Sequence, residues 1–363
     1  MKQTFAVTIC LISLLATRFS AASEADPSKV DVTKKMKVFI LAGQSNMEGK
    51  AKMELLNYQI TAPETKDFFK HLHKDGKYIE RNDVWINFLD RKGKLTVGFG
   101  SPGCIGPELE FGNAVGDAID EQVLLIKTAW GGRSLGRDFR PPSSGFPADE
   151  YLKKKLDEAN ANIHKQNEKE KDEKRKKPDT TLEEMKALYG KNYREMMENI
   201  DSVLKDLPAR FPDYKNQGYE IAGFVWFHGW NDMISPEFAA EYTTNLANLI
   251  RDVRKDLKVP NMPVVVGQMG QDGVNATGNM KILKDAQEAV EKIPEFAGNV
   301  KVVKTDVFWD TKAAEVFKGW REHQDEWKKV GSDFGYHYLG SAITYCKIGR
   351  EMGDAMLELM KKN

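Results

Sequence analysis

Five short apolar runs constrain the fold of this chain more than any other feature of its sequence. They span residues 37–42, 122–128, 220–227, 263–268 and 300–304. Continuous apolar runs of this length are typical of parallel strands buried on both faces. Helical or mixed segments separate the runs, an alternation that produces right-handed crossovers with helices on both sides of a sheet. We therefore predict an α/β fold with a mainly parallel five-stranded sheet.

The first run ends in a glycine and three polar residues, Gly43-Gln44-Ser45-Asn46. In open parallel sheets, ligands bind beyond the carboxyl ends of the strands, and Ser45 would lie there. Serine also commonly caps the helix that follows a strand. This segment alone is compatible with a reactive hydroxyl and with a helix cap.

Two later loops place hydrogen-bond donors at the same edge of the predicted sheet. The run at 122–128 leads into Gly131-Gly132, and the run at 220–227 leads into Gly229-Trp230-Asn231-Asp232. Free backbone N–H groups and an asparagine amide are the donors that stabilise an oxyanion. A third loop, residues 106–112, carries Gly and Glu residues and is expected to supply a further part of the site.

A histidine near the end of the chain could supply the base that a serine nucleophile needs. His337 follows Asp333 and Gly335, just ahead of an amphipathic stretch from Ser341 to Met360. An imidazole that removes the serine proton, oriented by an acid, activates the hydroxyl. Taken singly, His337 also fits a structural surface histidine, and Asp333 fits a helix-capping residue.

Together these blocks resemble the SGNH (GDSL-like) hydrolase superfamily, and within it the sialate O-acetylesterase-domain branch, which includes carbohydrate acetylesterases. The resemblance implies a flavodoxin-like three-layer α/β/α sandwich. It implies Ser45 as the nucleophile, His337 as the general base and Asn231 as a side-chain oxyanion donor. It also implies a backbone oxyanion donor in the glycine pair, with Gly132 preferred and Gly131 second.

The acid of the expected triad departs from the pattern of the superfamily. Its acid usually stands three residues before the histidine, where this chain has Phe334, whereas Asp333 is four residues before. A turn at the intervening Gly335 would bring Asp333 to the ring. Asp232, Asp310 and a Ser-His dyad supported by a backbone carbonyl stay open as alternatives. The rival G-x-S-x-G motif is excluded because Met47 occupies the position of its second glycine.

Three residues are candidates for contact with substrate. They are Gln44, Arg133 and His228. The Arg133 guanidinium could bind a carboxylate, as in sialic or uronic acid, or form a salt bridge within its loop. His228 could contact substrate or orient Asn231. No motif indicates a cofactor or a metal site, and 54 basic against 54 acidic residues give no field that favours nucleic acid.

The first residues predict an exported protein. Lys2, an apolar run and the small residues Ser20-Ala21-Ala22 read as a signal peptide over residues 1–22, which leaves no membrane span after its removal. A single domain over residues 23–363 would carry a charged helical insertion at about residues 150–207, and the protein would be secreted or periplasmic. Cys104 and Cys346 could pair or stay free thiols.

These observations predict a secreted serine esterase that removes O-acetyl groups from a carbohydrate through an acyl-enzyme. Sialic acid and plant or algal polysaccharides are the candidate substrates, and neither the sugar nor the oligomeric state is indicated. Two alternatives stay open. A wide apolar acyl pocket would favour an esterase on non-sugar acyl esters. Because the acid is displaced, a catalytically weak glycan-binding module is the other alternative.

Overall fold

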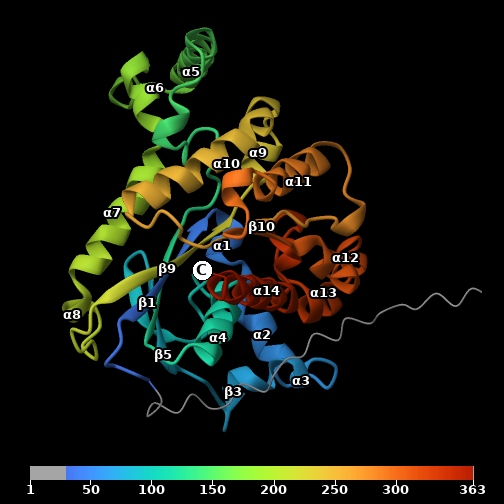
Figure 1. Cartoon of the computed structure of the whole chain (residues 1–363). Helices are drawn as coiled ribbons and strands as arrows, with labels where there is room; N and C mark the ends of the chain where they lie inside the picture. Colours follow the sequence, from blue (N-terminus) through green and yellow to red (C-terminus); the bar gives the residue numbers. More distant parts are fainter. Residues whose placement is uncertain (1–29, 363) are drawn as a thin grey trace, which may run out of the picture.

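The computed structural model describes residues 30–362, so the predicted signal peptide lies outside the described residues. A seven-stranded sheet forms its centre (Figure 1). Its strands are β1 (Met36–Gly43), β5 (Arg81–Phe88), β6 (Arg91–Leu95), β8 (Val123–Ala129), β9 (Tyr219–Phe227), β10 (Val264–Gln268) and β11 (Val300–Lys304). Two short ribbons pair β2 (Ala51–Lys52) with β7 (Cys104–Ile105), and β3 (His73–Lys74) with β4 (Lys77–Tyr78).

The helices connect these strands over both faces. They are α1 (Ser45–Glu48), α2 (Met53–Gln59), α3 (Lys66–Phe69), α4 (Glu108–Ala118), α5 (Asp149–Lys169), α6 (Leu182–Leu188), α7 (Lys191–Lys205), α8 (Leu207–Arg210), α9 (Trp230–Met233), α10 (Pro236–Asp256), α11 (Gly278–Glu291), α12 (Thr311–Phe317), α13 (Gln324–Val330) and α14 (Ala342–Met360). A 3-10 segment, η8 (Gly335–Gly340), precedes α14. In the described part of the chain, no helix is long and apolar enough to cross a membrane.

The strand order is β11-β10-β9-β1-β8-β5-β6, and only β6 runs antiparallel to its neighbour. All five predicted strands are present, as β1, β8, β9, β10 and β11. In sequence order they lie 2-1-3-4-5 across the sheet, which is the flavodoxin-like order. The predicted number of strands is wrong, because β5 and β6 extend the sheet beyond β8.

Alternate residues of each strand face two separate layers of helices, as the two-residue period of a strand requires. Ile40 and Ile126 pack with α7, α10 and α11, whereas Phe39 and Leu125 pack with α4 and α14. Figure 1 shows these helices on the two sides of the sheet. The fold is therefore the predicted three-layer α/β/α sandwich.

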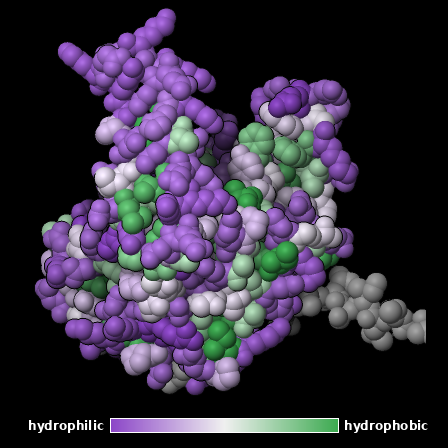
Figure 2. All heavy atoms as spheres, turned by 90° about the horizontal axis from the view of Figure 1, so that it is seen from above, coloured by the Kyte–Doolittle hydropathy of each residue, from purple (hydrophilic) through white to green (hydrophobic). Residues whose placement is uncertain are grey.

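Two helices of the predicted insertion stand apart from this body. In Figure 1, α5 and α6 project from it, while α7 lies along the sheet. Leu152, Met185 and Tyr189 form a small core of their own between α5 and α6. The protruding helices expose mostly charged residues, and the face drawn in Figure 2 is hydrophilic over most of its area.

Candidate active site

The loops after β1, β8 and β9 meet at one edge of the sheet. Gly43 at the end of β1 is level with Ala129 of β8 on one side and with Phe227 of β9 on the other. The order of strands along the chain reverses at β1, and ligand crevices of open α/β sheets lie at such points. The segments that carry Ser45, Gly131-Gly132 and Asn231 therefore start side by side.

Gly43 gives Ser45 its position. Its φ is +154°, and a Cβ atom there would lie 2.1 Å from the carbonyl oxygen of Phe227, so only glycine fits between β1 and β9. Gln44 then continues in an extended conformation, and α1 begins at Ser45. Ser45 is 7% exposed, and within residues 30–362 its hydroxyl makes no hydrogen bond to another side chain or to the backbone.

The two glycines after β8 differ in what their N–H groups bind. The Gly131 N–H donates to Glu48 Oε1 at 2.7 Å, and the second oxygen of Glu48 accepts from Lys50 Nζ at 2.7 Å. Burial works to raise the pKa of Glu48, but Lys50 and the Gly131 amide outweigh it and lower that pKa. Gly132 is exposed with φ +71°, and its N–H has no partner among the described residues. Of the two glycine N–H groups, that of Gly132 is therefore the free one.

The Asn231 amide is oriented by Gln44. Gln44 is 2% exposed, and its Oε1 accepts from the Gly229 N–H at 3.2 Å. Its Nε2 donates to Asn231 Oδ1 at 3.5 Å. Asn231 Oδ1 therefore faces Gln44. The Asn231 NH₂ group has no hydrogen-bond partner in the described chain and is available as a donor. The buried position of Gln44 does not fit the expected direct contact with substrate.

His228 and Asp232 are buried on either side of Asn231. His228 Nε2 donates to the carbonyl oxygen of Arg133 at 2.9 Å, and Nδ1 lies 3.1 Å from Tyr242 Oη. Burial lowers the pKa of His228 to about 3, so the ring is neutral. Both ring nitrogens of His228 have hydrogen-bond partners within the protein. This placement does not fit the expected contact with substrate. The Arg133 side chain, by contrast, is 46% exposed, with its guanidinium 4.0 Å from Asp138.

The Asp232 carboxylate fixes the loop after β8 to the loop after β9. It accepts from the backbone N–H groups of Leu135 at 2.8 Å and Gly136 at 2.7 Å. Burial raises the pKa of Asp232 to about 7, against the effect of these two donors. Asp310, the other alternative acid, accepts from Ala313 N and from the Ser341 hydroxyl. Both carboxylates are therefore engaged away from His337.

Asp333 is the carboxylate that lies beside His337. Its Oδ2 is 3.1 Å from His337 Nδ1, although the ring N–H does not point straight at that oxygen. Its Oδ1 accepts from the Phe334 N–H at 2.7 Å. Burial works to raise the pKa of Asp333, but His337 and the Phe334 amide outweigh it and lower that pKa. The spacing of four residues does not prevent the contact.

The turn that makes this contact contains two left-handed residues, Tyr338 (φ +51°) and Leu339 (φ +60°). Such conformations are strained for residues other than glycine and need support from the surroundings. The fully buried Tyr338 supplies it, because its hydroxyl accepts from the Gly270 N–H at 2.8 Å and lies 2.7 Å from Thr305 Oγ1. Gly335, from which we expected the turn, does not have a positive φ.

Hydrogen bonds join the Ser45 segment to the His337 segment. Asn46 Nδ2 donates to the carbonyl oxygen of Tyr336 at 3.1 Å. Tyr345 Oη donates to Asn46 Oδ1 at 2.9 Å and lies 3.4 Å from the carbonyl oxygen of His337. The two ends of the chain are thus fixed together at this site.

A buried ion pair beneath the site was not predicted from the sequence. Lys127 is fully buried in β8, and its Nζ donates to Glu108 Oε2 at 2.7 Å and to the Glu48 carbonyl oxygen at 2.7 Å. Burial lowers the pKa of Lys127, although Glu108 works to raise it. A lysine inside an apolar strand and a glutamate in the loop at 106–112 were the available signals. The pair anchors the end of α1, three residues after Ser45.

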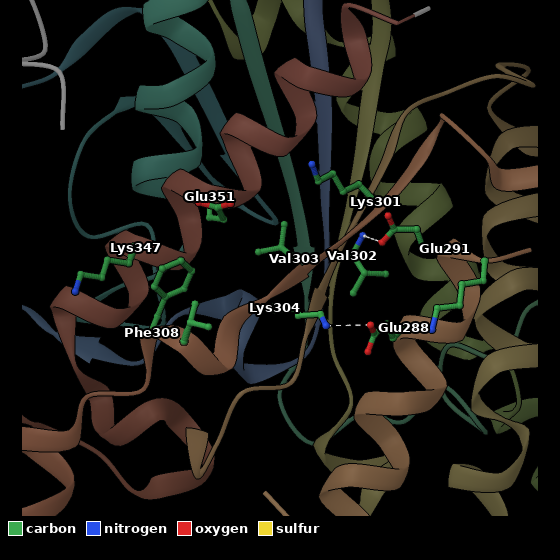
Figure 3. Close-up of a pocket in the computed structure, with 11 residues that line it drawn as sticks. Glu288, Glu291, Lys301, Val302, Val303, Lys304, Phe308, Lys347 and Glu351 are labelled. Atoms are coloured by element: carbon green, nitrogen blue, oxygen red, sulfur yellow. Dashed lines mark hydrogen bonds and ion pairs between the residues drawn. The ribbon is translucent and has the colours of Figure 1, made fainter. Parts of the chain in front are cut away.

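Another cavity lies away from these residues, at edge strand β11. Its lining includes Lys301, Lys304, Glu288 and Glu351, and Figure 3 shows Lys304 directed at Glu288 across it. None of the predicted site residues lines this cavity. In residues 30–362, no group of three or more His, Cys, Asp or Glu side chains could hold a metal ion, and Cys104 and Cys346 are buried free thiols.

Comparison with known proteins places the chain in a family. A protein of Arabidopsis thaliana with a solved structure is 16% identical, with a TM-score of 0.49 over 89% of this chain and 98% of that one. A carbohydrate acetylesterase from Xanthomonas citri is 11% identical, with a TM-score of 0.46 over 90% of this chain and 57% of that one. No curated protein sequence matches. Residues 35–312 match the family described as carbohydrate esterase, sialic acid-specific acetylesterase, so the chain belongs to that family.

Proposed function

We propose that this protein is a serine esterase that removes O-acetyl groups from carbohydrates through an acyl-enzyme. Membership of a carbohydrate esterase family supports the substrate class. The observation that carries the mechanism is that one sheet edge gathers an unpartnered Ser45 hydroxyl, a free Gly132 N–H and an Asn231 amide oriented by Gln44. The Asp333–His337 pair is fixed to the same edge through Asn46.

In the proposed reaction, Ser45 Oγ attacks the acetyl carbonyl while His337 Nε2 takes the hydroxyl proton. The Gly132 N–H, the Asn231 amide and the N–H of Ser45 itself stabilise the oxyanion, and each such donor contributes about 10²–10³ in rate. His337 then returns the proton to the departing sugar oxygen. Water hydrolyses the acetyl-enzyme by the same sequence, with His337 acting again as base.

Asp333 is assigned to orient His337 and to stabilise its charged form. A carboxylate at Nδ1 keeps the proton on that nitrogen, which leaves Nε2 free to accept the serine proton. The contact is imperfectly aligned without substrate, as catalytic hydrogen bonds often are. Gln44 and His228 are assigned to positioning, Gln44 through Asn231 and His228 through the loop that carries Arg133. Arg133 remains the candidate for substrate contact.

We also propose export. Residues 1–22 carry the pattern of a signal peptide, and residues 23–363 form the mature esterase domain. The charged helices around residues 150–207 are an addition to that domain.

Two measurements test the function. Acetate release is measured from acetylated sialic acid, xylan and pectin, with Ser45→Ala as the control variant. We expect release from at least one of them and none from the variant. A fluorophosphonate probe should label Ser45 in the unmodified protein. Hydrolysis of lipid or aryl esters alone would support the non-sugar esterase, and glycan binding without any hydrolysis would support the binding module.

A further inference from the structure

A groove of about 820 Å³ lies beside the Asp333–His337 pair. Its volume is within the range of about 300–1,000 Å³ that small-molecule sites occupy. Residues of α2 form one side, α13 and the segment after α12 form the other, and Trp327 lies buried within the lining. Asp333 lines the groove and also contacts His337. The groove therefore borders the candidate active site at Asp333.

Aromatic rings lead from this groove to His337. Trp320 meets Phe334 edge to face, with ring centres 6.5 Å apart. Phe334 lies nearly parallel to Tyr336, with centres 5.5 Å apart and 15° between the planes. Tyr336 in turn lies 4.5 Å from the His337 ring. Phe334 is 46% exposed and Tyr336 is 38% exposed. Large aromatic rings exposed side by side mark a binding surface.

The groove carries equal numbers of basic and acidic side chains, and all but one of them are unpaired within the described chain. Its lining includes three basic residues, Lys52, Lys328 and Lys329, and three acidic residues, Glu54, Asp325 and Asp333. Apart from Asp333 with His337, these side chains form no ion pair with any described residue. In the cavity at β11, by contrast, Lys304 pairs with Glu288. Free donors and acceptors of both signs suit the hydroxyl groups of a neutral saccharide.

Part of this groove lies outside the segment that matches the family. The match ends at residue 312, whereas Phe317, Trp320, Trp327 and Phe334 all come later. The segment is held in place by its own core, since Trp327 and Leu339 pack with Ala313 of α12. Its aromatic rings therefore stand on a folded support.

We propose that the groove binds sugar rings that neighbour the acetylated residue of a neutral oligosaccharide or polysaccharide chain. This inference rests on the proposed esterase function. Rings of the saccharide pack against the exposed parts of Tyr336, Phe334 and Trp320, while charged side chains on the two sides bind their hydroxyls. The acetyl group then enters between Ser45 and His337. The substrate is an extended glycan rather than a free acetylated monosaccharide.

The test compares three probes on the full-length protein: p-nitrophenyl acetate, O-acetyl methyl xyloside and O-acetylated xylotetraose. We expect kcat/KM for the tetrasaccharide to exceed that for the monosaccharide by at least tenfold. Trp320→Ala should lower the tetrasaccharide-to-monosaccharide ratio about three- to tenfold, as loss of one aromatic contact does. Glu54→Trp, at an exposed position of α2, fills the groove without removing a core contact and should lower the same ratio.

Tyr219→Ala is the matched control, because Tyr219 is 39% exposed but lies at the opposite end of β9. It should leave the ratio unchanged. Equal kcat/KM for the two sugars, or a ratio insensitive to both groove variants, would overturn the groove assignment and leave the esterase intact. Hydrolysis of p-nitrophenyl acetate with neither sugar cleaved would support the non-sugar esterase, and would contradict both the proposed function and the groove assignment that rests on it. Failure to cleave any of the three probes would instead contradict the proposed function.

Discussion

Replacing Gln44 by glutamate should turn the Asn231 amide away from the oxyanion. In the native protein, Gln44 Nε2 donates to Asn231 Oδ1, and Oε1 accepts from Gly229 N. Glutamate keeps the acceptor for Gly229 but places a second oxygen against Asn231 Oδ1. Rotation of the Asn231 side chain replaces that repulsion with a charge-assisted hydrogen bond.

The magnitude follows from these contacts. A hydrogen bond to a charged group contributes about 1.5–3 kcal/mol. Because the Asn231 NH₂ group has no other partner among residues 30–362, no competing bond opposes the rotation. A difference of about 1.4 kcal/mol already gives a tenfold preference, so the rotated form dominates. The enzyme then loses one oxyanion donor, which costs about 10²–10³ in kcat.

The assay is kcat for p-nitrophenyl acetate, with thermal unfolding as the check on the fold. Gln44→Glu should approach the loss of Asn231→Ala, and Gln44→Met, which frees the amide without turning it, should lose less. The double variant Gln44→Glu/Asn231→Ala should be no slower than Asn231→Ala alone. If the loss of kcat in the double variant equals the product of the two single losses, the reasoning is refuted, because Gln44 then acts independently of Asn231.

Three further outcomes are expected. Ser45→Ala should abolish labelling by a fluorophosphonate; labelling that survives would place the nucleophile elsewhere. Asp333→Asn should lower kcat by orders of magnitude because it misplaces the proton on His337, and a loss below about tenfold would point to a Ser-His dyad. His71 lies 2.6 Å from Glu110, which outweighs burial and raises the pKa of His71 above 6.5. The pair of protonated His71 with Glu110 stabilises the fold fully below pH 6.5, and this stabilisation is lost as the pH rises through the raised pKa of His71. Between about pH 6 and 9, the Tm of the native protein should therefore fall more than the Tm of His71→Gln. An equal fall in both would contradict this assignment.

The strands that the sequence predicted correctly are those buried on both faces by apolar side chains. Strand β5 was missed because it begins with polar residues, among them Arg81 and Asp83, and only the folded protein shows that both are buried in an ion cluster with Asp117. Strand β6 was missed because an edge strand with lysines and a glycine carries no apolar run. Polar residues in a strand do not reveal whether a distant partner neutralises them.

The same limit applies to the site. That the segments around Ser45, Gly132 and Asn231 start at one edge of the sheet could be predicted, because each follows a recognisable strand. The hydrogen bond from the Gly131 N–H to Glu48 could not be predicted, because it depends on where the Glu48 side chain points. The approach of Asp333 to His337 depends on left-handed residues that no local preference of tyrosine or leucine predicts.

The bond between Asn46 and Tyr336 joins positions 290 residues apart and has a consequence for biosynthesis. His337 and Asp333, the proposed base and its carboxylate, leave the ribosome after all seven strands of the central sheet, and α14, which covers one face of that sheet, follows them. A nascent or truncated chain that lacks this segment would hold the Ser45 loop without the proposed base, and apolar side chains of the strands would be exposed. Contacts so distant in sequence also form slowly. The proposed esterase activity therefore requires that the segment from Asp333 through α14 has been synthesised and has folded onto the sheet.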